Sequence, residues 1–86
     1  MNLSSSDIEA LKTSPKTVGA RQTAQAIQKG KAKVVFVAKD SDEWVVRDII
    51  DMCKQKGIKL VFVDSKKELG KICGISVAAS SAAIIE

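Results

Sequence analysis

Residues 33–38 read KVVFVA, and this stretch decides how the rest of the sequence is interpreted. Consecutive side chains of a strand point to opposite faces, so a strand that is apolar at nearly every position has both faces covered. A strand with one face in water would alternate apolar and polar residues instead. The stretch therefore predicts a central strand whose sheet has helices on both sides.

A helix is expected immediately before this strand, from Ala20 to Lys29. Its apolar face would consist of residues at helical spacing, namely Ala20, Thr23 or Ala24, and Ile27. Gly30 follows as a C-terminal stop signal. Gly19 precedes the helix and supplies a tight turn out of a very short strand at residues 17–18.

A long helix is expected after the central strand. Either Asp40 or Ser41 would cap it, and Gly57 would end it. Its inward residues would be Val45 or Val46, Ile49, Ile50 and Cys53. Trp44, the only tryptophan, can be a packing residue at the helix start or an exposed contact, and packing is favoured.

The last third of the chain continues the alternation. Residues 60–63 predict a second buried strand, and residues 80–85 predict the last one. Between them, Ser65 and Glu68 form a capping box that opens a short helix. Its inward residues would be Leu69, Ile72 and Cys73, with Gly74 as its end.

Helices and strands therefore alternate along nearly the whole chain. Upstream, Ser6 begins a further capping box and a short helix that ends before Pro15. This order predicts an α/β protein, a three-layer α/β/α sandwich with a central mixed four-stranded sheet. Because 86 residues leave room for one core, residues 1–86 are expected to form a single domain.

Composition favours a globular protein of the cytoplasm. Hydrophobic residues make up 45% and charged residues 28%, as in ordinary folded domains. The apolar run Val34–Ala38 is far too short to cross a membrane, and the N-terminus lacks the order of a signal peptide. Cys53 and Cys73 stand apart, which favours reduced packing residues over a disulfide. We expect a monomer without a membrane partner.

Positive charge is concentrated in the first half of the chain. The net charge is +4, and residues 15–39 hold six basic residues and no acidic one. Such an excess fits a polyanionic partner. Solvated lysines at a helix end and turn explain Lys29, Lys31 and Lys33 equally well.

The sequence has few of the residues and motifs that enzymes use for catalysis. The chain has no histidine or tyrosine and no nucleotide-binding or nucleophile-elbow motif. The carboxylates Asp42, Glu43, Asp48 and Asp51 fall on the outward side of a helix, where solvated charge is the usual interpretation. Two distant thiols without an imidazole cannot complete a zinc site. We therefore expect no enzyme, metal, cofactor or small-molecule substrate.

The first candidate binding segment is the start of the helix that follows Gly19. Free amides and a partial positive charge at a helix N-terminus suit phosphate oxygens. Arginine and glutamine side chains can also pair with base edges. The residues concerned are Gly19, Ala20, Arg21, Gln22 and, one turn later, Gln25.

The second candidate segment is the apolar stretch 75–79, which reads ISVAA and follows a helix-stopping glycine. Loops are normally polar, so these side chains either tuck into the core or form a platform for a partner such as a splayed base.

At these segments the sequence resembles the kink-turn-binding ribosomal protein family. The similar stretches are GARQTAQAIQKGKAKVVFVAKD from Gly19, CKQKGIKLVFVDSKKELGKICGI from Cys53, and SVAAS from Ser76. In that family the glycine-turn helix reads sheared G·A pairs and the apolar loop packs on a flipped-out nucleotide. The resemblance implies that Gly19, Arg21, Gln22 and Gln25 belong to the first surface and Ile75, Ser76 and Val77 to the second. Lys66 and Lys67 would flank the RNA backbone.

The departures from the family pattern concern the same segments. The archaeal branch carries Asn-Glu where this chain has Arg21-Gln22, which is closer to the Lys-Gln of the bacterial and eukaryotic branches. A proline often stands where this chain has Ala78.

The sequence is therefore interpreted as a protein that binds and stabilises kink-turn RNA, ribosomal or ribosome-associated, with ribosomal RNA among the expected partners. The alternative is a protein-interaction module of the same fold that uses the apolar loop 75–79.

Overall fold

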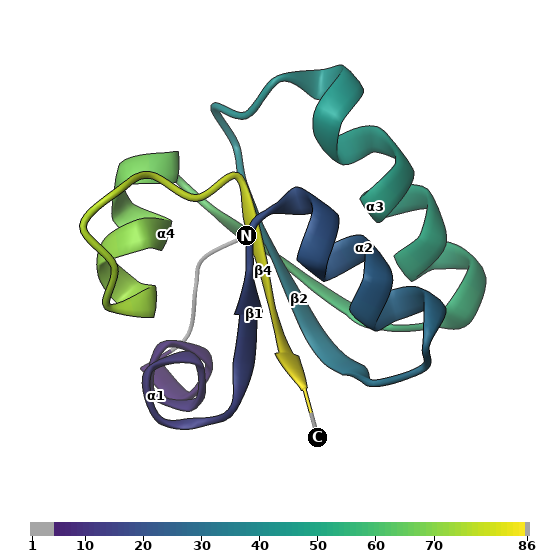
Figure 1. The fold of residues 1–86 in the computed structure, drawn as a ribbon, viewed down its shortest axis with the longest axis horizontal. Coiled ribbons are helices and arrows are strands. Elements are labelled where there is room, and N and C mark those ends of the chain that lie inside the picture. The colour runs from purple at the N-terminus through teal and green to yellow at the C-terminus, as the bar shows by residue number, and fades with distance from the viewer. Residues whose placement is uncertain (1–4, 86) are drawn as a thin grey trace.

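The computed structural model describes residues 5–85, which form a sheet with helices on both faces (Figure 1). The elements follow in the order α1 (Ser5–Thr13), β1 (Lys16–Val18), α2 (Ala20–Gln28), β2 (Ala32–Ala38), α3 (Glu43–Lys56), β3 (Lys59–Val63), α4 (Lys66–Cys73) and β4 (Ser81–Ile85). The strand order is β1-β4-β2-β3, with β2 parallel to β3 and β4 antiparallel to β1 and β2. The predicted α/β/α sandwich with a mixed four-stranded sheet is confirmed.

The central strand β2 is buried on both faces, as its composition predicts. Phe36 and Ala38 belong to a core cluster beneath α1 and α4, and Val35 and Val37 belong to a second cluster beneath α2 and α3. Burying a side chain as large as that of Phe36 contributes about 1.5–3 kcal/mol. The alternating side chains of one strand thus hold both helix layers in place.

Local signals in the sequence set most helix ends. The Ser65 hydroxyl accepts a hydrogen bond from the Glu68 N–H at 3.1 Å, which confirms the capping box of α4. Gly57 and Gly74 close α3 and α4 in left-handed conformation. The capping box expected at Ser6 involves side chains that lie outside the described residues. No helix within the described range is long and apolar enough to cross a membrane.

The predicted cap of α3 is wrong. Asp42 is the residue that precedes this helix, and it makes no side-chain cap hydrogen bond. The Asp40 carboxylate instead accepts a hydrogen bond from the Lys66 N–H at 2.7 Å, and the Ser41 hydroxyl donates to the Ser80 carbonyl at 3.1 Å. Both side chains therefore connect the end of β2 to distant segments.

The favoured packing role of Trp44 is wrong as well. The face of α3 that contacts the sheet contains Val46, Ile49 and Cys53, and all three are buried. At 100° per residue, Trp44 falls almost opposite Val46 in the first turn. Its side chain is consequently 71% exposed.

Chain direction brings several loops to one edge of the sheet. Strands β1, β2 and β3 all end there, and β4 begins there because it runs antiparallel to β1 and β2. We call this edge the carboxyl edge. The Gly19 N–H donates to the Ser81 carbonyl at 2.8 Å, and the Ala38 N–H donates to the Ser80 carbonyl at 2.9 Å. The two segments singled out by the sequence both adjoin this edge (Figure 1).

Candidate nucleic-acid interface

The start of α2 is fixed by the backbone of Gly19. This residue has φ 105° and ψ 152°, a region that is almost restricted to glycine. The space of a Cβ at Gly19 is also occupied, because Gln22 Oε1 lies 2.9 Å from that position. The chain can therefore pass directly from β1 into α2, with Gln22 folded over the turn.

The N-termini of α2 and α4 differ in how their amides are satisfied. At α4, the Asp40 carboxylate accepts from Lys66 and the Ser65 hydroxyl accepts from Glu68. At α2, no side chain makes a cap hydrogen bond and the first turn has no acidic residue. The positive end of the α2 dipole is therefore not offset, which suits a phosphate group.

The polar side chains of α2 face solvent. Arg21, Gln22 and Gln25 are exposed, whereas Thr23 and Ile27 are buried on the opposite face. The sequence left open whether Thr23 or Ala24 belongs to the inward face of this helix. Thr23 is the buried residue, because Ala24 is only half-buried. A hollow of about 190 Å³ beside α2 is lined by Gln22, Gln25, Thr17, Ala26, Lys29, Lys31 and Ile85.

In the loop after α4, some apolar side chains pack into the core and others are exposed to solvent, so both arrangements that its composition allowed occur together. Ile75 is half-buried against the core beneath α1 and α4, and Ala79 is fully buried. Ser76 and Ala78 are exposed, and Val77 is 67% exposed. The ends of the loop are thus anchored, and an apolar side chain projects from its middle.

Gly70 holds this loop against α4. A Cβ at Gly70 would overlap the Val77 carbonyl oxygen and lie 3.2 Å from the Val77 carbonyl carbon. The Ile75 N–H donates to the Gly70 carbonyl at 3.0 Å, and the Ala79 N–H donates to the Lys66 carbonyl at 3.1 Å. The loop backbone therefore follows the surface of α4 closely.

The structure brings the two candidate segments to the carboxyl edge. Gly19 bonds to the first residue of β4, which the loop enters, and Lys66 bonds to Asp40 and to Ala79. Lys39 and Asp64 form an exposed ion pair of 3.5 Å at this edge, which stabilises the fold little. Lys67 is exposed and lines a different hollow, between α4 and α1.

The two thiols offer no reactive group. Burial raises the pKa of Cys53 and of Cys73, and nearby Lys16 opposes that shift only at Cys73. Both side chains therefore stay protonated near neutral pH and pack as small apolar groups. Among the described residues, no three His, Cys, Asp or Glu side chains are grouped so that they could hold a metal ion.

A model of the ribosomal protein L7Ae/L30e/S12e/Gadd45 family matches residues 1–86. The chain belongs to this family. The resemblance described above is thereby confirmed.

Two relatives of this L7Ae-family chain are named RNA-binding protein. One, from Caldanaerobacter subterraneus subsp. tengcongensis, is 48% identical over 68 residues, and one from Bacillus pumilus is 38% identical over 68 residues. Each alignment covers 79% of this chain and 83% of the relative.

Solved structures agree on the fold of this L7Ae-family chain. The Giardia lamblia 15.5kD RNA binding protein superposes with a TM-score of 0.83 at 29% identity, covering 92% of this chain and 70% of that one. A Bacillus halodurans protein of unknown function superposes with a TM-score of 0.75 at 19% identity, covering 92% of this chain and 76% of that one. The second similarity concerns the fold alone.

Sequence reasoning missed several residues that shape this candidate interface. Asp40 was expected to cap α3, and nothing local indicates that its carboxylate reaches Lys66. A glycine within a helical pattern can signal close backbone approach, and Gly70 is such a case. Lys12 and Lys71, which share a hollow with Lys67, were not singled out either.

Proposed function

We propose that this L7Ae-family chain binds RNA and that it recognises kink-turns, stabilising the bent RNA without catalysing a reaction. One observation carries the proposal: the open, polar start of α2 and the loop 75–79, from whose middle the apolar side chain of Val77 projects, adjoin the same carboxyl edge. The names of the two bacterial relatives and of the Giardia protein support RNA as the ligand.

The two segments would contribute different contacts. The free amides of α2 would hold phosphate oxygens, while Arg21, Gln22 and Gln25 would read the edges of the sheared G·A pairs. Ile75, Ser76 and Val77 would pack against a nucleotide flipped out of the stack. Lys66 and Lys67 would lie beside the RNA backbone. We further propose that the protein acts as a monomer associated with the ribosome in the cytoplasm.

The test is a titration of the purified protein against a kink-turn RNA and against the same duplex with its G·A pairs replaced by Watson–Crick pairs. Each RNA is titrated at two salt concentrations. We expect tight binding of the first RNA, weak binding of the second, and affinity that falls with salt because lysine and arginine contacts release counterions. Equal, weak and salt-sensitive binding of both RNAs would contradict kink-turn recognition.

A second candidate is a protein-docking module of the same fold, and the 67% exposure of Val77 favours it. An apolar contact of this kind should depend little on salt, whereas RNA binding should depend on it steeply. In the titration above, RNA recognition predicts preferential binding of the kink-turn RNA, whereas the docking function predicts no such preference.

A further inference from the structure

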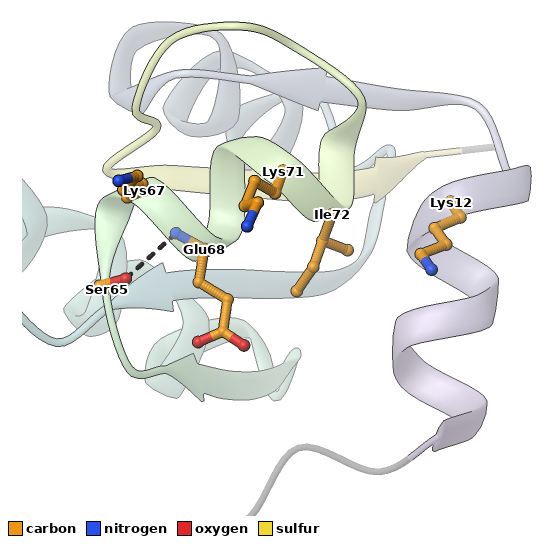
Figure 2. A pocket seen from close by; sticks show the side chains of 6 residues that line it. All are labelled: Lys12, Ser65, Lys67, Glu68, Lys71 and Ile72. Carbon is orange, nitrogen blue, oxygen red and sulfur yellow. Dashed lines mark hydrogen bonds between the residues drawn. The ribbon is translucent and has the colours of Figure 1, made fainter.

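A second positively charged surface lies between α1 and α4. It is a hollow of about 480 Å³ lined by Ser65, Lys67, Glu68, Lys71 and Ile72 of α4 and its cap, and by Lys12 of α1. Figure 2 shows Lys67 and Lys71 along α4, with Lys12 facing Ile72 from α1. We call Lys67, Lys71 and Lys12 the lysine track.

The charges of this hollow do not cancel. Among the described residues, three lysines line it against one carboxylate, that of Glu68. Within the same part of the chain, no ion pair within 4.0 Å is recorded for Lys12, Lys67 or Lys71. All four side chains are exposed. The hollow therefore offers uncompensated ammonium groups to an anionic partner.

The lysine track continues from the carboxyl edge. Ser65, which lines the hollow, is followed by Lys66, whose backbone bonds to Asp40 and to Ala79 at that edge. From there α4 runs toward α1 (Figures 1 and 2). A rigid polyanion that leaves the edge over α4 would meet Lys67, then Lys71, then Lys12.

The spacing and the chemistry fit a nucleic-acid strand. Lys67 and Lys71 are four residues apart, which is about 6 Å along the helix. One strand of a DNA duplex carries a phosphate for about every 3.4 Å of helix axis, so a comparable length of duplex presents about two phosphates. Among the described residues that line the hollow, Ile72 is the only apolar one, so these residues offer little to apolar side chains of a protein partner.

We propose that the lysine track holds the phosphate backbone of one RNA arm as it leaves the kink-turn. The proposal rests on the proposed function, because it needs RNA at the carboxyl edge. It adds a contact that depends on the length of one arm and not on the kink itself.

The experiment compares kink-turn RNAs in which one arm at a time is either about three or about twelve base pairs long, the longer exceeding the 28 Å extent of the protein. We expect lengthening of one arm, and only that one, to tighten wild-type binding about tenfold at low salt. The variant Lys12→Gln/Lys71→Gln should lose this gain, and its salt slope with the long-armed RNA should fall by about two.

Two further variants make the test specific. Lys54→Gln/Lys56→Gln removes the same charge from the last turn of α3, which packs on the opposite face of the sheet from α1 and α4, and should keep the gain. Glu68→Gln removes the opposing carboxylate while keeping a residue suited to a capping box, and should tighten binding of the long-armed RNA about two- to threefold. Thermal unfolding of each variant checks that the fold is retained.

The outcomes separate the two proposals. If short-armed kink-turn RNA is bound specifically but lengthening either arm has no effect, the lysine track is refuted and the proposed function stands. The lysine track is also refuted if Lys12→Gln/Lys71→Gln and Lys54→Gln/Lys56→Gln lose the extra affinity for long-armed RNA equally, because net charge alone would then explain that affinity. If no kink-turn RNA is preferred over its Watson–Crick control, both proposals fail.

Discussion

The start of α2 and the loop 75–79 adjoin the same edge but are built in opposite ways. Helical hydrogen bonds fix the first segment, and its exposed residues are polar. Close backbone contacts with α4 fix the second, and its most exposed large side chain is that of Val77. The exposed polar side chains of the helix can thus be removed without disturbing the fold, whereas the position of Val77 depends on where the loop backbone lies.

The strongest test of this difference is Gly70→Ala. The new methyl group would overlap the Val77 carbonyl, and backbone cannot move aside as a flexible side chain can. We expect unfolding in denaturant to show a loss of about 2–3 kcal/mol, as for overpacked core sites. RNA affinity should fall as well, because the loop is displaced.

Gly74→Ala is the matched control for that variant. Gly74 has φ 79°, so alanine is strained there, but no atom lies within 4 Å of the new methyl group. The expected loss of stability is about 1 kcal/mol, with RNA affinity retained. Equal effects of the two substitutions on affinity would show that close packing of the loop does not matter.

Arg21→Ala and Gln22→Ala should have the opposite profile. Both side chains are exposed, so stability should change by less than about 0.5 kcal/mol. Each should weaken binding of kink-turn RNA by about 1–2 kcal/mol, as loss of a base-edge contact does. Wild-type affinity in both variants would remove α2 from the interface.

Val77→Ser examines the loop side chain without moving its backbone. We expect affinity to fall by about 1 kcal/mol, as when an apolar contact with a base is removed. Because no charge is involved, titrations at two salt concentrations should give the same loss. A loss that disappears at high salt would argue against an apolar contact.

Lys31→Ala should have the smallest effect. Its side chain is exposed, and its backbone N–H, which donates to the Ala26 carbonyl at 2.9 Å, is unchanged by the substitution. The expected loss of RNA affinity is below about 0.5 kcal/mol. A loss as large as that of Gln22→Ala would extend the interface along the hollow that the two residues share.

The parts of the fold predicted correctly are those set by local rules. The KVVFVA stretch is buried on both faces, and the Ser65 capping box opens α4, because strand periodicity and capping need only neighbouring residues. The layers and the mixed sheet followed from the alternation of such elements. The RNA contacts of the site residues stay predictions.

The incorrect predictions concern side chains whose position is set by residues far away in the sequence. The Asp40 carboxylate bonds to an amide 26 positions away, so no neighbouring residue reveals its partner. Trp44 is apolar enough to predict packing, but the phase of α3 is set by Val46, Ile49 and Cys53. The close approach of Gly70 to Val77 likewise depends on how the loop returns over α4.

The position of β4 has a consequence for how the protein is made. It is the last described strand along the chain, yet it lies between β1 and β2 in the sheet. During synthesis, Gly19 and the start of α2 emerge long before Ser81, to which Gly19 bonds. A nascent chain therefore carries Arg21 before the backbone around Gly19 is held in place. Under the proposed function, selective RNA recognition would begin only once β4 is inserted.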